Sequence, residues 1–123
     1  MLGVDLVDVP EFAEQLSDTA SGFVDGTFTA REQRTAKGDA RRLAARFAAK
    51  EAFIKAWSGS RRGQPPLLAR IDLREIEVVD DGYGRPGLRL HGTVAEAVGP
   101  VATHLSLSHD GRSAIAFVTI DRA

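Results

Sequence analysis

Two acidic residues, Asp5 and Glu51, stand among apolar neighbours and are the first residues of this sequence that could do chemistry. A half-buried carboxylate costs several kcal/mol unless a cation or a hydrogen-bond donor compensates its charge. Both carboxylates are oxygen ligands suited to Mg²⁺, which prefers one or two of them together with water and substrate phosphates. Two simpler interpretations stay open: Asp5 as a hydrogen-bonded structural carboxylate, and Glu51 as the partner of Lys55 one helical turn later.

A histidine near the C-terminus could act beside such a site. His109 closes an apolar strand face next to a turn. Many histidines in such places are structural or solvent-facing, but one at a hairpin tip can bind a substrate phosphate or shuttle a proton. His91 and His104 have no comparable context and receive no role. The sequence lacks the residue patterns of P-loops, dinucleotide-binding turns, zinc helices and nucleophile elbows.

Composition restricts the class of protein. The 123 residues are expected to form a single domain, residues 1–123, with room for a hydrophobic core. The net charge of −1 gives no general case for binding nucleic acid or a membrane surface. The chain has no cysteine, which excludes disulfides, thiolate catalysis and cysteine-ligated zinc. Without a signal peptide or a long apolar run, we expect a cytoplasmic protein.

A long helix must position Glu51 and Lys55. Asp39 can cap a helix over about residues 40–57, and its segment 43–57 is rich in strong helix formers without Gly or Pro. The face expected to pack into the core carries Leu43, Phe47, Ile54 and Trp57. Glu51 lies on the shoulder of this apolar face.

The remaining elements follow from alternation and capping patterns. Alternation predicts a strand over residues 2–7, and capping boxes predict helices over about 9–16, 29–37 and 93–98. Residues 17–26 and 58–68 are expected to be loops. Strands are predicted at 71–79 and 88–91, and a final hairpin joins 101–109 to 112–120 through Asp110-Gly111. This order predicts an α+β fold with an antiparallel sheet packed against the long central helix.

Five segments, in order, resemble the holo-acyl-carrier-protein synthases, which are 4'-phosphopantetheinyl transferases. They are Gly-Val-Asp-Leu-Val at 3–7, Phe28-Thr29 with Glu32, Arg-Phe-Ala-Ala-Lys-Glu-Ala-Phe-Ile-Lys-Ala at 46–56, Gly84-Arg85-Pro86, and Ser-Leu-Ser-His-Asp at 106–110. A lone Lys-Glu pair would be weak evidence. Five segments at about the right separations, across nearly the whole chain, make a specific match.

The resemblance implies an enzyme that moves the phosphopantetheine arm of coenzyme A to a serine of an apo acyl carrier protein, in support of fatty acid biosynthesis. Adenosine 3',5'-bisphosphate leaves. By resemblance, Asp5 and Glu51 bind Mg²⁺, and Lys55 contacts phosphate. The turn Gly84, Arg85, Pro86 lies along the adenine side of coenzyme A, and His109 lies at the nucleotide phosphates. Family members of this length are typically homotrimers with active sites in clefts between subunits.

This activity fits the chemistry of the residues. Transfer through the β-phosphate leaves negative charge on pyrophosphate oxygens, so catalysis depends mainly on positioning and charge stabilisation. We expect Lys55, with Arg46 or Lys50, to neutralise a pyrophosphate bridged by Mg²⁺, and His109 to help hold it. The expected catalytic residues are therefore Glu51, Lys55 and His109. The serine proton is expected to pass to a metal-bound water or to Glu51.

One segment departs from the family pattern. Family members often carry basic residues on the first helix, where the acidic carrier docks, but here this helix carries Glu11, Glu14 and Asp18 and no basic residue. Either the basic stretch 31–46 docks the carrier, or the carrier is less acidic, such as a domain of a multifunctional synthase. Two other functions stay open: an Mg²⁺-dependent phosphoanhydride hydrolase, and a non-catalytic nucleotide-binding module.

Overall fold

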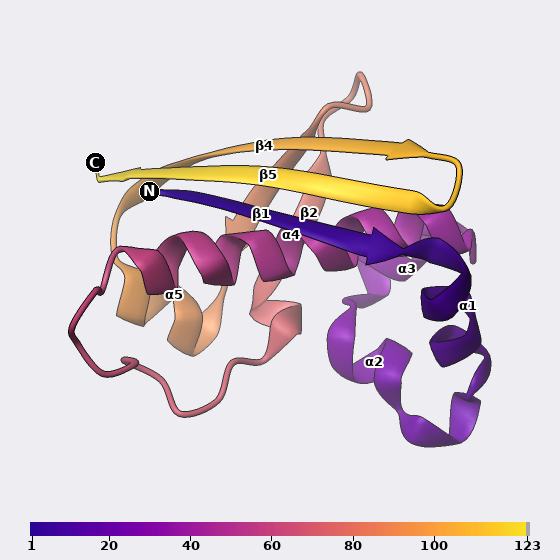
Figure 1. Cartoon of the computed structure of the whole chain (residues 1–123), viewed down its shortest axis with the longest axis horizontal. Coiled ribbons are helices and arrows are strands. Elements are labelled where there is room, and N and C mark those ends of the chain that lie inside the picture. Colours follow the sequence, from indigo (N-terminus) through magenta and orange to yellow (C-terminus); the bar gives the residue numbers. More distant parts are fainter. Residues whose placement is uncertain (123) are drawn as a thin grey trace.

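The structure is a computed structural model that describes residues 1–122 (Figure 1). Its elements are β1 (Leu2–Asp8), α1 (Val9–Ser17), η1 (Thr19–Ser21), α2 (Phe23–Thr27), α3 (Ala30–Ala36), α4 (Ala40–Gly59), η2 (Leu73–Glu75), β2 (Ile76–Asp80), β3 (Pro86–Leu90), α5 (Gly92–Val98), β4 (Val101–Asp110) and β5 (Ser113–Arg122). Within the described residues, the strands form an antiparallel sheet in the order β1-β5-β4 and a separate β2-β3 hairpin. The predicted α+β fold is confirmed.

Helix α4 lies along one face of the three-stranded sheet and forms the centre of the molecule (Figure 1). Asp39 caps it as predicted, accepting hydrogen bonds from Arg41 N at 2.9 Å and Arg42 N at 3.4 Å. The predicted core face is only partly right, since Leu43 and Trp57 are buried but Phe47 and Ile54 are half-buried. The closest packing comes instead from small residues and one ring: Ala44, Ala48, Ala52, Phe53 and Ala56 are at most 1% exposed.

Strand β1 reaches α4 through a glycine. A Cβ added at Gly3 would overlap the carbonyl oxygen of Ala52, so only a residue without a side chain allows this approach. The strand therefore runs directly against the helix, and the inward-facing Asp5 and Val7 that follow Gly3 at alternate positions are carried to the same side.

The opposite face of the three-stranded sheet is apolar and exposed. Leu2 and Leu6 are each 64% exposed, and Val4 is 41% exposed. Phe117 pairs with Val4 across β1 and β5 and is 46% exposed. In the part of the chain that the structure describes, no element covers these side chains. Contiguous apolar surface of this kind marks an interaction face.

Two predicted loops contain helical turns. Residues 17–26 include η1 and the start of α2, because Phe23 packs its ring against Phe12 at 5.7 Å and Phe47 at 5.8 Å between centroids. The strand predicted from residue 71 begins only at Ile76, after the single turn η2, which Asp72 caps by accepting from Arg74 N. Tertiary packing and a local cap explain both differences.

Two turn assignments also change. The predicted capping box of Thr93 and Glu96 does not form at the N-terminus of helix α5. Instead, Glu75 Oε1 accepts from Thr93 Oγ1 and Val94 N, both at 2.9 Å. In the last hairpin Asp110 pairs with Ser113, so the two loop residues are Gly111 and Arg112. Gly111 takes a φ of +57° at the first loop position, where tight hairpins favour glycine.

None of the helices in residues 1–122 combines the length and the apolar character needed to span a membrane.

Candidate active site

Asp5, Glu51 and Lys55 meet between β1 and α4, at a place that we call the β1 cleft. Asp5 lies on the strand face toward α4, and its Oδ1 accepts from Lys55 Nζ at 2.9 Å. Glu51 precedes Lys55 by one turn of α4. The Asp5 side chain is 15% exposed and that of Lys55 is 57% exposed, so the lysine can turn toward a ligand without leaving a buried position.

The negative charges of the two carboxylates in the β1 cleft repel each other. Burial raises the pKa of Glu51 above its ordinary value, the negative charge of Asp5 raises it further, and Lys55 partly opposes them. The two side chains line one open cavity of about 310 Å³, together with Asp8, Glu11 and Phe47. A cation placed between two such carboxylates would relieve their repulsion.

This donor set fits Mg²⁺. Among residues 1–122, no group of three or more acidic or histidine side chains is arranged to hold a metal by itself. Two carboxylates beside an open cavity nevertheless match the usual Mg²⁺ site, which leaves the other positions to water and substrate phosphate. Asp5 and Glu51 are the residues that would hold the ion.

A second cavity, the β4 cleft, lies on the other side of α4 and has a volume of about 440 Å³. It is lined by Arg46, Gly84, Pro86 and His109, four residues singled out in the sequence. Arg42 and Ser108, which belong to the basic stretch 31–46 and to the matched segment 106–110, line it too, and sequence reasoning missed Thr35 and Asp80. Arg42 lies one helical turn before Arg46, so both side chains lie on the same face of α4.

Arg46 is the most constrained cation of the β4 cleft. Its side chain is 8% exposed, Nη2 donates to Asp80 Oδ2 at 3.2 Å, and Nη1 donates to the Arg42 carbonyl at 3.1 Å. Its Nε is buried and has no hydrogen-bond partner among the described residues. A buried donor without an acceptor is destabilising, so an acceptor arriving in this cleft would be bound favourably.

Arg85 does not line the β4 cleft, although its two chain neighbours do. Its Nε donates to Asp81 Oδ2 at 2.7 Å, and its guanidinium lies 4.9 Å from the ring centroid of the exposed Tyr83. These contacts hold the Arg85 side chain at the tip of the β2–β3 hairpin.

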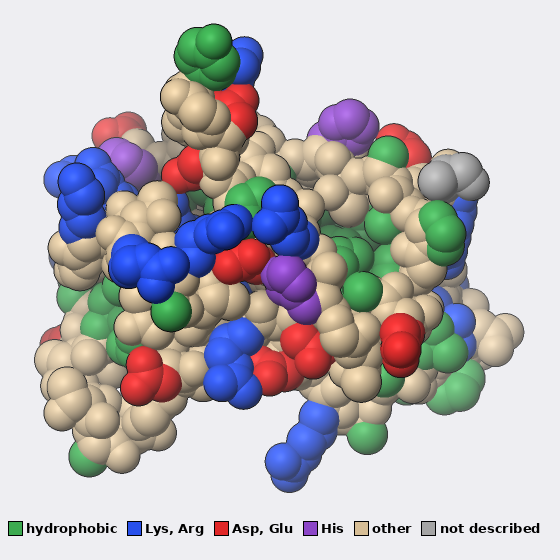
Figure 2. Space-filling view, turned by 180° about the vertical axis from the view of Figure 1, so that it is seen from behind, with side chains coloured by type: hydrophobic (Ala, Val, Ile, Leu, Met, Phe, Trp, Pro, Cys, Tyr) green, Lys and Arg blue, Asp and Glu red, His purple; other side chains and the backbone are tan. Residues whose placement is uncertain are grey.

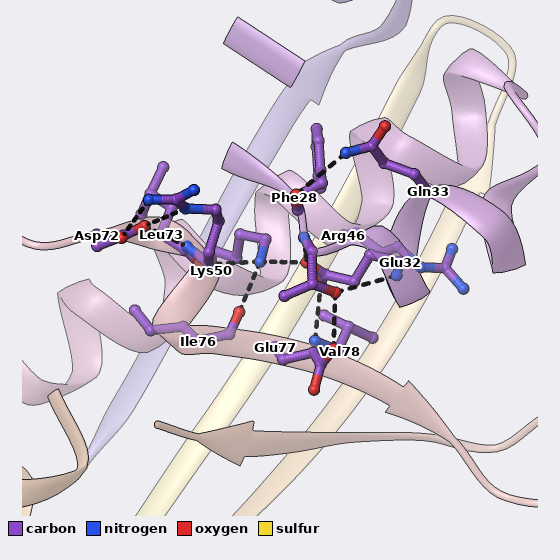
Figure 3. A network of polar contacts seen from close by, with 12 residues as sticks. Phe28, Glu32, Gln33, Arg46, Lys50, Asp72, Leu73, Ile76, Glu77 and Val78 are labelled. Carbon is purple, nitrogen blue, oxygen red and sulfur yellow. Dashed lines mark hydrogen bonds and ion pairs between the residues drawn. The ribbon is translucent and has the colours of Figure 1, made fainter. Parts of the chain in front are cut away.

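Lys50 lines neither cleft and lies instead in a buried network of polar contacts (Figure 3). Its Nζ is fully buried and donates to Glu32 Oε1 at 2.8 Å and to the carbonyls of Leu73 at 2.9 Å and Ile76 at 2.7 Å. Burial lowers the pKa of Lys50, and the charge of Glu32 opposes this. All three ammonium hydrogens are used, so the expectation that Lys50 binds phosphate is replaced by a structural role.

Glu32 completes this buried network. Its Oε1 also accepts from Thr29 N at 3.0 Å, and its Oε2 accepts from Val78 N at 2.9 Å. The capping box that predicted α3 is therefore present, with Glu32 accepting from Thr29 and Thr29 Oγ1 from Glu32 N. Its glutamate additionally joins α3, α4 and β2, a tertiary role that local sequence does not reveal (Figure 3).

The predicted site residues thus form two groups in one chain. Asp5 lies on β1 and His109 on β4, at opposite edges of a sheet in which β5 runs between them. Strand spacing of about 4.8 Å separates the two edges by roughly 10 Å. Helix α4 packs over the buried Ala114 and Ala116 of the intervening strand. Among the described residues, the two clefts share no lining side chain.

Comparison with known proteins agrees with the resemblance of the five segments. A family description, "4'-phosphopantetheinyl transferase superfamily", matches residues 1–118. Holo-[acyl-carrier-protein] synthases of Mycobacterium tuberculosis and Mycobacterium ulcerans are each 48% identical over 124 residues, covering 98% of this chain and 95% of the relative.

Solved structures agree as well. The acyl-carrier-protein synthase of Chronobacterium ammoniagenes in complex with coenzyme A has a TM-score of 0.93 and 44% identity, covering 99% of this chain and 96% of that one. The Mycobacterium tuberculosis acyl carrier protein synthase has a TM-score of 0.84 and 48% identity, with the same coverage. The chain therefore belongs to the 4'-phosphopantetheinyl transferase superfamily.

Proposed function

We propose that this protein transfers the 4'-phosphopantetheine arm of coenzyme A to a serine of an acyl carrier protein, in an Mg²⁺-dependent reaction that releases adenosine 3',5'-bisphosphate. The observation that carries this proposal is the pairing of two clefts with complementary chemistry. One cleft offers carboxylates for a metal, and the other offers cationic groups for nucleotide phosphates. The names of the relatives and the coenzyme A complex of a similar structure support it.

In the β1 cleft, Asp5 and Glu51 hold the metal and Lys55 binds the pyrophosphate. When bound, Mg²⁺ supplies charge stabilisation for the pyrophosphate oxygens. The exposed Lys55 ammonium leaves Asp5 and donates to a phosphate oxygen as charge develops there. The serine oxygen forms a bond to the β-phosphorus, the bond from that phosphorus to the bridging oxygen breaks, and the hydroxyl proton passes to water.

In the β4 cleft, Arg46 and His109 hold the nucleotide phosphates. The unpartnered Arg46 Nε provides a buried donor, and the exposed His109 side chain provides an accessible one. Gly84 and Pro86 line the same cavity and form the wall beside the adenosine. Arg85 lies between them in the chain, and its pair with Asp81 is exposed, so its guanidinium can turn toward the nucleotide as Lys55 can turn toward the pyrophosphate.

One substrate must contact both clefts, and we infer that two subunits provide them. The β1 cleft of one chain then faces the β4 cleft of the next, which is a heterologous contact between different surfaces. Heterologous contacts close into a ring when the rotation from one subunit to the next is a simple fraction of a full turn. The exposed apolar sheet face with Leu2, Val4 and Phe117 gives such a ring its buried interface. Among rings, the family resemblance favours a homotrimer.

Charge can guide both anionic partners to this site. Figure 2 shows Lys and Arg side chains gathered below the projecting β2–β3 hairpin. The exposed basic residues of α3 and the start of α4, with the turn between them, are Arg31, Arg34, Lys37, Arg41 and Arg42. Their field attracts coenzyme A and an acidic carrier, whereas α1 presents Glu11 and Glu14.

The test is a mass spectrum of an apo acyl carrier protein after incubation with this protein, coenzyme A and Mg²⁺. The expected result is a carrier heavier by one phosphopantetheine arm, with no gain in EDTA and no gain with the folded Glu51→Gln variant. Coenzyme A cleaved without any carrier would instead indicate a hydrolase. Coenzyme A bound but unchanged with every carrier tried, including domains of multifunctional synthases, would indicate a binding module.

A further inference from the structure

A carboxylate lies beside the buried cation of the β4 cleft. The cleft is lined by groups that can carry positive charge, Arg42, Arg46 and His109, and also by the acidic Asp80. Asp80 Oδ2 accepts from Arg46 Nη2 at 3.2 Å. The functions assigned above make no use of this carboxylate, although it lies where an anionic ligand is expected to bind.

The orientation of the Arg46 guanidinium does not depend on Asp80 alone. Its Nη1 donates to the carbonyl of Arg42 at 3.1 Å, and the side chain is only 8% exposed. Arg42 precedes Arg46 by one turn of the same helix, so this contact belongs to α4 itself. We therefore expect the guanidinium to keep its place when Asp80 moves away from it.

Asp80 fills only half of the edge that Arg46 presents. The Nε and Nη2 groups of an arginine point to the same side and form a fork for two oxygens of one carboxylate or phosphate. At Arg74 this fork is full, because Nε donates to Asp72 Oδ1 at 3.0 Å and Nη2 donates to Oδ2 at 2.8 Å. At Arg46 only Nη2 has an acceptor, and Nε has none among the described residues.

A phosphate can fill this fork completely. In the proposed arrangement the pyrophosphate lies in the β1 cleft of the neighbouring subunit, so the phosphate that reaches the β4 cleft is the one on the ribose 3' oxygen. Two of its oxygens can accept from Nε and Nη2 of Arg46 together. Since like charges at this distance repel, Asp80 must turn away, and its side chain, 27% exposed at the end of β2, can turn toward solvent.

We propose that Asp80 is an internal counter-ion that competes with the 3'-phosphate for Arg46 and so weakens the binding of coenzyme A and of the bisphosphate product. The inference rests on the proposed function. In the free enzyme the carboxylate compensates a buried cation, which would otherwise be destabilising. As the product leaves, Asp80 returns to Nη2 and the cation is never left without a partner. The carboxylate therefore favours release of the product after each transfer.

The experiment measures binding to Asp80→Asn by titration calorimetry with three ligands: adenosine 3',5'-bisphosphate, coenzyme A and dephospho-coenzyme A. Asparagine keeps the shape and an oxygen that can accept from Arg46 Nη2, but it has no charge. The Kd of the bisphosphate and of coenzyme A should fall about tenfold, whereas dephospho-coenzyme A, which lacks the 3'-phosphate, should stay within about twofold. The bisphosphate should also become a roughly tenfold stronger inhibitor of carrier loading.

Asp80→Ala separates a counter-ion from a residue that positions Arg46. A counter-ion role predicts tighter bisphosphate binding here too, and a larger rise of the unfolding temperature with bisphosphate, although the free variant unfolds earlier than the wild type. A positioning role predicts weaker binding. The control is Glu96→Gln, which removes one negative charge at an exposed position of α5 outside both clefts and should leave every Kd within about twofold.

Three outcomes would overturn the inference. Unchanged or weaker bisphosphate binding in either Asp80 variant, with the wild type binding it and loading the carrier, would remove the counter-ion and leave the transferase standing. An equal gain for coenzyme A and dephospho-coenzyme A would show that Asp80 does not compete with the 3'-phosphate. A wild type that binds none of the three ligands would contradict the proposed function, and the inference with it.

Discussion

Two lysines on α4, five residues apart, show how one helix serves both the fold and the site. Lys50 is fully buried and gives all three hydrogens to Glu32, Leu73 and Ile76. Lys55 is 57% exposed and has one partner, Asp5. The difference teaches that a conspicuous motif mixes residues with unrelated roles. What separates them is whether protein groups already use the ammonium hydrogens.

Lys50→Met should have the largest effect on stability. The change removes one partner of a buried ion pair and leaves the Glu32 carboxylate without its cation, which typically costs 3–5 kcal/mol. Chemical denaturation should therefore show a large loss of unfolding free energy, or no folded protein. A variant with wild-type stability would contradict the structural role of Lys50, and Glu32→Gln/Lys50→Met should recover part of the loss because it removes both charges.

Lys55→Met should have the opposite pattern, with little effect on stability and a large effect on activity. The exposed pair with Asp5 contributes about 0–1 kcal/mol, so thermal unfolding should hardly change. Transfer should fall by about two orders of magnitude, because a cation at the phosphate oxygens is lost. The matched control is Arg74→Met, which removes a cation that is 51% exposed and paired with Asp72, outside both clefts. Full activity in Lys55→Met would remove this residue from the proposed mechanism.

A smaller effect is expected at the edge of the buried network. Burial raises the pKa of Glu77, but hydrogen bonds from Thr29 and His91 outweigh it, and the pKa ends below its ordinary value of 4.5. The stability that this carboxylate adds is therefore present above about pH 4.5 and is lost as the pH falls through the folded-state pKa.

Unfolding temperatures measured from neutral pH down to acid should test this. Glu77→Gln should lose part of the acid dependence while staying folded at neutral pH. If its pH profile runs parallel to that of the wild type, the Glu77 carboxylate does not link protonation to folding.

Local signals predicted most of the fold. Asp39 and the Thr29–Glu32 capping box marked the starts of α4 and α3, since both caps depend on residues within one turn. The strands around residues 101–120 followed from alternation, with the turn displaced by one residue to Gly111-Arg112. Helix α2 was not predicted, because it is stabilised by the packing of Phe23 against rings far along the chain and not by local propensity.

The site was predictable in its members but not in its arrangement. Residue types and resemblance brought out Asp5, Glu51 and Lys55, which the structure brings together. Nothing in spacing could reveal that His109 and Arg46 lie on the other side of α4. That separation depends on strand order, since β5 runs between β1 and β4.

We infer that each active site combines the β1 cleft of one subunit with the β4 cleft of another. The direct measurement coexpresses two inactive variants, Glu51→Gln and the double variant Arg42→Ala/His109→Ala. Each changes one cleft and leaves the other intact. An intact site needs the β1 cleft of a double-variant chain beside the β4 cleft of a Glu51→Gln chain. In mixed rings formed from equal amounts of both, about one quarter of the interfaces meet this condition.

The account therefore predicts that each variant alone fails to load the carrier, whereas the coexpressed mixture recovers about a quarter of wild-type activity per site. If both clefts of one chain formed the site, every chain would carry a defect. A mixture that stays as inactive as its components, while the mixed oligomer is seen by mass spectrometry, would contradict the account.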